Sequence, residues 1–142
     1  MKVKEIVAAY KVLGEAKVTK LEESEVIKII KARKVMRPIA EEFEAILKDA
    51  QEKFKPECWD DVQEKLAQWQ KEGENTTLTD AEKKGINKAL IDYQNSINKV
   101  LNDELERDVE LNIETLKEES ATKLIVENGW ELKKLEEIEV VL

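Results

Sequence analysis

A heptad seam over residues 24–54 limits the fold of this chain more than any other feature of its sequence. Its apolar side chains alternate at spacings of three and four residues, the repeat of a helix that packs along one continuous stripe. At about 1.5 Å per residue, such a helix is roughly 45 Å long. The stripe consists of Ile29, Ala32, Met36, Ile39, Phe43, Ile46 and Ala50, widened on one flank by Val26, Ala40, Leu47 and Phe54. The sequence therefore predicts a fold arranged around one long amphipathic helix.

A second long helix is predicted over residues 79–106. Thr79 and Glu82 have the spacing of a capping box, in which each side chain accepts a hydrogen bond from the other residue's backbone amide. Gly85 and several asparagines lower the intrinsic propensity of this helix, so it depends on packing. We expect it to lie antiparallel to the first long helix, with a crossing angle of about 20°. Its stripe is Ile86, Leu90, Tyr93, Ile97 and Val100, flanked by Ala89 and Leu101.

Shorter helices are predicted to pack beside the long pair. Gly14 is placed to end an N-terminal helix, since glycine tolerates the left-handed cap, and Ser24 is placed to cap the first long helix. Pro56 ends that helix, and a short helix follows that closes near Gly73. The stripes of the two short helices are Val3, Ile6, Tyr10 and Leu13, and Trp59, Val62, Leu66 and Trp69.

A short segment near residue 110 has the alternation of a strand. Val109, Leu111 and Ile113 are separated by single polar residues, which is typical of a half-buried strand. A strand needs a hydrogen-bonding partner, and residues 16–21 are the best candidate because they carry no helical stripe. The sequence therefore predicts a minor two-stranded β element.

The segment around residues 124–132 allows two interpretations. Asn128-Gly129 between two aliphatic runs is typical of a β-hairpin turn. The spacing of Asn128 and Glu131 also fits an N-cap pair that opens a helix, and this alternative is favoured. That helix would bury Leu132, Leu135 and Ile138. The predicted fold is thus mainly α, an antiparallel pair of long helices with shorter packing helices, in a single helical domain over residues 1–142 with a strand and helix subregion at 108–142.

Composition excludes several classes of function. The chain has 142 residues and a net charge of −8, which makes nucleic acid and anionic membranes poor partners. It has no histidine, and Cys58 is its only cysteine, so an intramolecular disulfide, a usual zinc site and a Ser–His or Cys–His catalytic pair are not expected. No apolar run approaches the roughly 20 residues of a membrane span, and the first residues do not resemble a secretory signal. We therefore expect synthesis in the cytoplasm and no membrane partner.

One enzymatic hypothesis rests on four carboxylates. Glu41, Glu44, Glu57 and Asp60 have a spacing similar to that of all-helical nucleoside triphosphate pyrophosphatases, which hold magnesium against a triphosphate. Such a pattern arises readily by chance in a chain with 32 acidic residues. The two glutamates also point away from the seam. We therefore predict no catalytic, cofactor-binding or metal-binding residues and no cofactor.

Six apolar residues are the candidates for an interaction surface. Tryptophan is enriched at binding hot spots, although filling the core is the favoured explanation of the three tryptophans. An aliphatic strand can add to the sheet edge of a partner. The candidate residues are Trp59, Trp69, Trp130, Val109, Leu111 and Ile113. A locally basic run, Lys28, Lys31, Arg33, Lys34 and Arg37, is interpreted as the solvated face of the first long helix, with Arg33 snorkelling from its flank.

The order of these pieces resembles a group of short, uncharacterised proteins encoded by tailed bacteriophages and prophages. The resemblance is carried by a short helix at residues 4–13, two long helices, the acidic-aliphatic stretch 105–113 and a leucine-rich terminal helix at 130–136. The tryptophan-bearing helix at 59–69 is not a feature of that group. The resemblance implies a viral setting, with a role in the virion or its assembly, and it supplies no site residues.

Two classes of function follow. The first is a non-catalytic structural or interaction protein that assembles with itself or with phage structural proteins, in the cytoplasm or in the virion. The second is a small acidic regulator that blocks another protein by imitating nucleic acid. Mimicry needs carboxylates ordered on one face, whereas acidic and basic residues are interspersed in this chain, so the first class is favoured.

Overall fold

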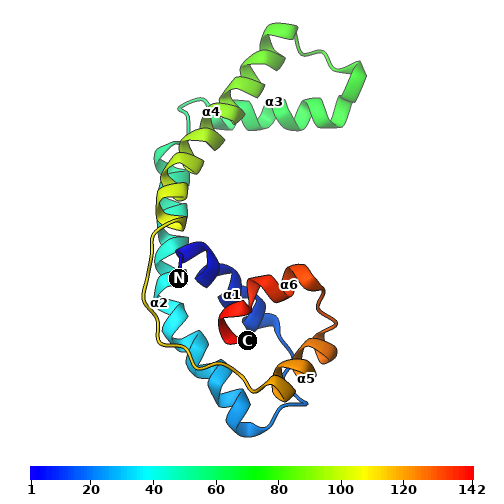
Figure 1. The fold of residues 1–142 in the computed structure, drawn as a ribbon. Helices are drawn as coiled ribbons and strands as arrows, with labels where there is room; N and C mark the ends of the chain where they lie inside the picture. The colour runs from blue at the N-terminus through cyan, green and yellow to red at the C-terminus, as the bar shows by residue number, and fades with distance from the viewer. The chain divides into compact units, whose positions relative to one another are not determined.

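The computed structural model describes all 142 residues, and the fold is mainly α as predicted. Six α-helices and two short 3-10 helices follow one another without any β-strand (Figure 1). Their bounds are α1 Val3–Glu15, α2 Glu23–Lys53, α3 Trp59–Glu72, η1 Gly73–Asn75, α4 Asp80–Leu105, α5 Glu118–Asn128, α6 Leu132–Glu137 and η2 Glu139–Val141. α2 and α4 lie within one residue of the bounds predicted for the two long helices.

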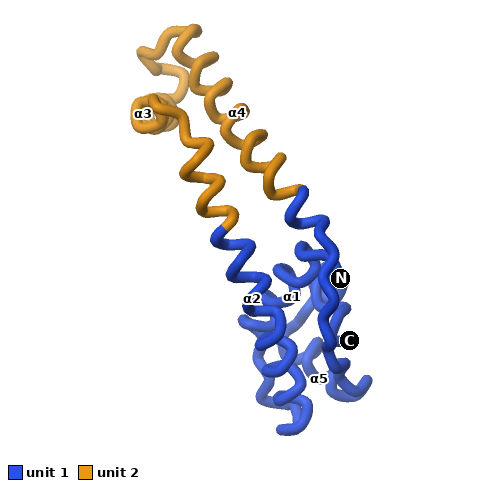
Figure 2. The backbone as a smooth tube through the Cα atoms, turned by 90° about the vertical axis from the view of Figure 1, so that its left-hand side faces the viewer, with its two compact units in different colours: residues 1–45, 103–142 blue, residues 46–102 orange.

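The chain forms two compact units, coloured separately in Figure 2. Unit 1 comprises Met1–Ala45 and Asp103–Leu142, and unit 2 comprises Ile46–Asn102. α2 and α4 therefore each contribute to both units. The single domain predicted from the sequence requires that the two units unfold together.

The core of unit 1 gathers the apolar faces of short helices around the first half of α2 (Figure 1). α1 contributes four residues and α2 three, and the rest come from the C-terminal segment. The buried residues are Ile6, Ala9, Val12, Leu13, Ile29, Ala32, Met36, Leu116, Leu124, Ile138 and Val141. Met36, Ile6, Leu124 and Ile138 are completely buried, so they form the centre of this core.

The seam of α2 is buried as its spacing predicts. Ile29, Ala32, Met36, Phe43 and Ala50 are buried, and the two other seam positions are partly buried. In unit 1, the first part of this seam packs against α1 and the C-terminal helices rather than against a second long helix. The antiparallel pairing of the long helices stays a prediction.

Two predicted caps are wrong. Gly14 lies inside α1, which continues to Glu15 and ends without a left-handed residue. A Cβ atom at Gly14 would lie 2.7 Å from Nη2 of Arg33, whose guanidinium stacks on the Tyr10 ring. The absence of a side chain at Gly14 thus leaves room for the guanidinium, which would have to shift if a Cβ atom were present. α2 begins at Glu23, before Ser24, so the serine does not cap it.

The two-stranded β element is not present. Residues 109–117 form neither helix nor strand, and the only β pairing is an isolated antiparallel bridge between Lys2 and Asp108. Around it, Met1 and Val109 exchange two hydrogen bonds, of 3.0 and 2.7 Å. Glu106 also accepts from Lys2 and Lys4, which lowers its pKa to about 2. The partner of this segment is thus the N-terminus and not residues 16–21.

Residues 16–21 are held instead by the end of α5. The Lys17 amide donates to Asn128 Oδ1 at 2.8 Å, and Asn128 Nδ2 donates back to the Lys17 carbonyl at 2.9 Å. One asparagine side chain thus pairs with a loop backbone as a neighbouring strand would. Gly129 then ends α5 in the left-handed conformation, at φ 61°. The hairpin alternative is therefore wrong, and the favoured helix is present as α6. Its N-cap is Glu131, whereas Asn128, the predicted N-cap, is the last residue of α5.

These contacts predict a specific pattern of amide hydrogen exchange. The amides of Val109 and Leu116 donate to Met1 and Val141 carbonyls, whereas none of the amides of residues 110–115 donates within the protein. We expect Val109 and Leu116 to be protected, while Leu111 and Ile113 exchange as fast as the loop amide of Thr77, which also has no acceptor within the protein. Exchange followed by NMR measures this. Strong protection at Leu111 and Ile113 would mean that the segment forms a ladder after all.

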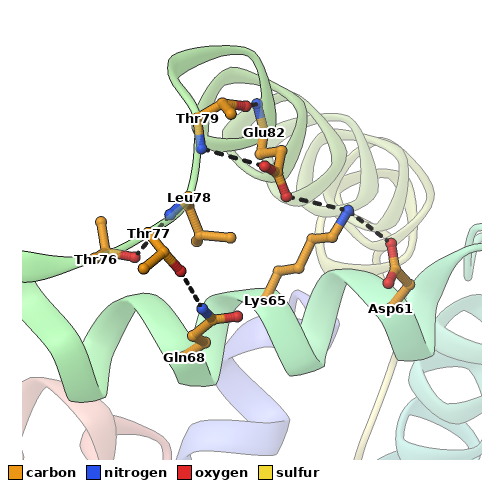
Figure 3. A network of polar contacts seen from close by, with 8 residues as sticks. All are labelled: Asp61, Lys65, Gln68, Thr76, Thr77, Leu78, Thr79 and Glu82. Atoms are coloured by element: carbon orange, nitrogen blue, oxygen red, sulfur yellow. Dashed lines mark hydrogen bonds and ion pairs between the residues drawn. The ribbon is translucent and has the colours of Figure 1, made fainter.

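Unit 2 has a smaller apolar cluster, of Val62, Leu78 and Ile86, where α3 meets the start of α4. The Thr79–Glu82 capping box is confirmed, with hydrogen bonds of 3.1 and 3.2 Å. Lys65 of α3 lies between Asp61 and Glu82, at 3.2 and 3.6 Å, so the capping glutamate also binds the neighbouring helix (Figure 3).

Candidate interaction surface

Trp59 and Trp69 both belong to α3 in unit 2, where they are partly buried. Each packs against the cluster of Val62, Leu78 and Ile86. The Trp59 ring lies 4.4 Å from the Tyr93 ring between centroids, and the Tyr93 hydroxyl donates to the Gln51 carbonyl. Lys83 Nζ lies 5.6 Å from the centre of the Trp69 ring. Both tryptophans therefore contribute to the packing of unit 2.

The other four candidates lie in unit 1. Trp130, Val109, Leu111 and Ile113 are partly buried, and all four pack against the core of that unit. Glu110 and Asn112 between the three aliphatic residues, and Glu114 after them, are exposed, so the alternation seen in the sequence is an alternation of burial. The six predicted residues thus divide between two units, and each is partly occupied by internal contacts.

A different surface of unit 1 is more exposed to solvent than these six candidate residues. The side of α2 opposite Ile29, Ala32 and Met36 carries apolar and cationic side chains together. Six exposed residues define what we call the α2 basic face: Ile27, Ile30, Lys31, Lys34, Val35 and Arg37. Ile30 has 60% of its surface exposed, which is unusual for a large aliphatic residue in the middle of a long helix.

The cations of this face have no internal partners. No ion pair of the structure includes Lys31, Lys34 or Arg37. Residues 26–40 contain five of the 24 lysines and arginines and none of the 32 acidic residues, so the face is locally positive in an acidic chain. The two remaining basic residues of the run are engaged, Lys28 with Glu25 and Arg33 with Tyr10.

A groove adjoins the α2 basic face. It has a volume of about 570 Å³ and lies between α2 and residues 112–114. Its lining is Lys28, Lys31, Ala32, Lys34 and Val35 from α2, and Asn112, Ile113 and Glu114 from the facing segment. We call it the 112–114 groove. It combines lysines, aliphatic side chains and a stretch of backbone within one hollow.

One end of the groove is fixed by a buried carboxylate. Glu25 is completely buried; its Oε1 lies 2.8 Å from Lys28 Nζ, and its Oε2 accepts from the Lys117 amide at 2.9 Å. The bonds from Lys28 and from Lys117, with a contribution from Ser120, lower the pKa of Glu25 below its ordinary value despite its burial. A glutamate of α2 therefore caps the first turn of α5.

Two further apolar side chains are largely exposed in unit 1. Val126 of α5 and Leu132 of α6 have 75% and 72% of their surfaces exposed. Val126 borders a shallow hollow with Lys20, Thr122, Lys123 and Glu127. The sequence prediction missed Val126, because α5 was not foreseen. It placed Leu132 in the terminal helix with Leu135 and Ile138. Of these three only Ile138, the residue after α6, is buried.

The four carboxylates of the enzymatic hypothesis fall in different units. Glu41 and Glu44 are in unit 1, and Glu57 and Asp60 are in unit 2; all four are exposed. No group of three or more acidic or cysteine side chains is arranged to hold a metal ion. None of the helices combines the length and apolar content required to cross a membrane.

The α2 basic face and the 112–114 groove therefore combine exposed aliphatic side chains with cations that have no ion pair. Comparison of the chain with models of protein families, with curated proteins and with solved structures gave no match.

Proposed function

We propose that the protein is a non-catalytic interaction protein that acts by packing its helical surface against other protein subunits. The observation that carries this proposal is the α2 basic face, where exposed isoleucines lie beside cations that have no internal partner. Contiguous exposed apolar surface on a protein usually marks an interface, because its contact with water is unfavourable. Unpaired cations at the same place add a means of selecting the partner.

The proposed setting is a phage particle or its assembly. It rests on the resemblance of the helix order and of the acidic-aliphatic stretch 105–113 to short phage and prophage proteins. The partners are then further copies of the chain or phage structural proteins. The protein would be made in the host cytoplasm and would either enter the virion or act only during its assembly.

Light scattering after size exclusion, at near-physiological salt, tests self-association against the monomer mass of 16.4 kDa. Sedimentation of a tagged copy with virions and assembly intermediates tests incorporation. We expect a multiple of the monomer mass, or co-sedimentation with particles. A strict monomer that is absent from every particle would contradict the proposal. A stable complex with a protein that is not part of any particle would favour the acidic regulator.

A further inference from the structure

We propose that the 112–114 groove binds an extended, acidic segment of another protein, which lies along α2 and adds to the free backbone of residues 110–115. This proposal rests on the function proposed above, and it names the partner surface. Three properties of the groove support it: its charge, its backbone and its apolar lining.

The charge of the groove selects an acidic occupant. Lys31 and Lys34 line it without any ion pair, and Arg37 lies one turn further along the α2 basic face. Lys28 is already neutralised by Glu25. Glu114 is the single carboxylate in the lining, and it lies near Lys28. Carboxylates of a partner would therefore bind at Lys31 and Lys34, away from Glu114.

The backbone of the groove favours an extended occupant. Contacts fix the course of the segment from residue 107 to residue 117 antiparallel to α2: Arg107 lies 3.9 Å from Glu42, and Lys117 donates to Glu25. Between these points, the amides of residues 110–115 have no acceptor within the protein. Val109, Leu111 and Ile113 point into the core, so in an extended chain the peptide groups point sideways. Residues 112–114 line the groove, so a second extended chain bound there would lie beside these peptide groups and could pair with them.

The apolar lining provides the remaining contacts. Val35 and the partly buried Ile113 lie on opposite walls, and Ile27 and Ile30 extend the apolar surface onto the α2 basic face. A chain in extended conformation directs alternate side chains to opposite faces. An occupant in which acidic and aliphatic residues alternate would match both the lysines and the aliphatic walls.

A second copy of this chain, bound symmetrically through the same surface, fits less well. In a twofold interface the same patch meets itself, so Lys31, Lys34 and Arg37 would face the same three cations of the other copy. Like charges brought together across an interface are costly. A segment of different composition, supplied by another protein, therefore fits the groove better than the same patch of a second copy.

Fluorescence anisotropy with a labelled peptide tests the proposal. The probe is a fluorescein-labelled peptide of about ten residues in which glutamate alternates with valine. It is titrated with the full-length chain and with two double variants of equal charge change. Lys31→Glu with Lys34→Glu alters the groove, and Lys11→Glu with Lys133→Glu alters exposed lysines of α1 and α6 that have no ion pair. We expect the first to weaken binding at least about tenfold and the control less than about twofold.

Two further ligands separate backbone pairing from simple charge attraction. The same peptide with N-methyl groups on all of its central amides keeps its charge but has no amide donor on either edge, so it cannot pair as a strand, and we expect it to bind at least about fivefold more weakly. A single-stranded oligothymidine of equal charge should not displace the probe. Equal binding of the N-methylated peptide, or displacement by the oligothymidine, would overturn the proposal, as would equal losses in the two double variants.

This test is independent of the broader one. If the protein self-associates or sediments with particles while the acidic peptide fails to bind, the groove proposal is wrong and the proposed function stands. If the peptide binds as expected while the protein is a monomer absent from all particles, the phage setting is wrong and the groove is still a binding site. Circular dichroism of each variant verifies that the helices remain folded.

Discussion

Replacing Met36 with alanine is expected to lower the free energy of unfolding by about 2–5 kcal/mol. Met36 is completely buried at the centre of unit 1, where it packs in one core with Ile6, Leu124 and Ile138, which are also completely buried. These residues come from separate helices and from the C-terminal turn, so the surroundings cannot collapse into the cavity without moving whole elements. The loss therefore includes both the transfer of the side chain and an unfilled cavity.

Urea denaturation followed by far-ultraviolet circular dichroism measures this loss. The matched control is Ile30→Ala, on the same helix but 60% exposed, for which we expect a change within about 0.5 kcal/mol. A loss below about 1 kcal/mol for Met36→Ala would show that this core is not packed as described. The single domain predicted from the sequence further requires one cooperative transition in both variants, whereas early loss of only part of the helical signal would show that the two units unfold separately.

The long helices were predictable because the signals that specify them are local. The spacing of the seam defines the buried side of α2, and the Thr79–Glu82 pair marks the start of α4 within a single turn. Gly73 ends α3 with a positive φ of 59°, which needs only the one residue. Such features depend on neighbours three or four residues apart, and a single sequence contains all of that information.

The predicted strand shows where a local pattern becomes ambiguous. Val109, Leu111 and Ile113 are buried on alternate positions, as their spacing indicates. Burial of alternate side chains requires only an apolar surface underneath, and here the helical core provides it. The hydrogen-bonded partner was a separate inference, and the amides of residues 110–115 in fact have no partner within the protein.

Other features depend on residues far apart in the sequence. Gly14 leaves room for the guanidinium of Arg33, and α5 is capped by a glutamate 92 residues away from Lys117. Neither contact can be recognised from the neighbouring residues in the sequence. The sequence therefore suggested a helix cap at Gly14 and no helix where α5 lies. The same limit explains why residues 16–21 were assigned to a strand instead of to Asn128.

The candidate surface was predictable only in part. The basic run from Lys28 to Arg37 is visible in the sequence, and the exposure of Lys31, Lys34 and Arg37 was correctly foreseen, whereas Lys28 and Arg33 are partly buried. Which of its cations are free depends on the fold, since Lys28 and Arg33 find partners while Lys31 and Lys34 do not. The tryptophans were chosen for their residue type, yet all three are partly buried against internal clusters.

Replacing Glu25 with glutamine is expected to destabilise unit 1 at neutral pH clearly more than any exposed acidic substitution. Glutamine keeps an oxygen for the Lys117 amide but loses the charge that pairs with Lys28, leaving that ammonium group beside a buried amide. The substitution also removes a negative charge from the start of α5, and that charge interacts favourably with the positive end of the helix dipole. The matched control is Glu23→Gln, two residues away and exposed, for which we expect little change.

The pH dependence of this difference gives a sharper test. The pKa of Glu25 in the folded protein lies below its ordinary value of 4.5, mainly because of Lys28 and then Lys117. A carboxylate with a depressed folded pKa stabilises the protein at pH values above its unfolded pKa, and that stabilisation is lost as pH falls through the folded pKa. We therefore expect the difference in unfolding free energy between the wild type and Glu25→Gln to be constant near neutral pH and to shrink as the pH falls below about 4.5. Urea titrations at a series of pH values measure this difference.

Glu106, Glu127 and Glu82, whose pKa values are also lowered, act equally in both proteins and cancel in the difference. Adding Lys28→Met to both proteins should reduce the difference at neutral pH, because the principal partner of the carboxylate is then absent. A difference that stays the same from neutral to acidic pH would show that the charge of Glu25 does not hold α5 in place.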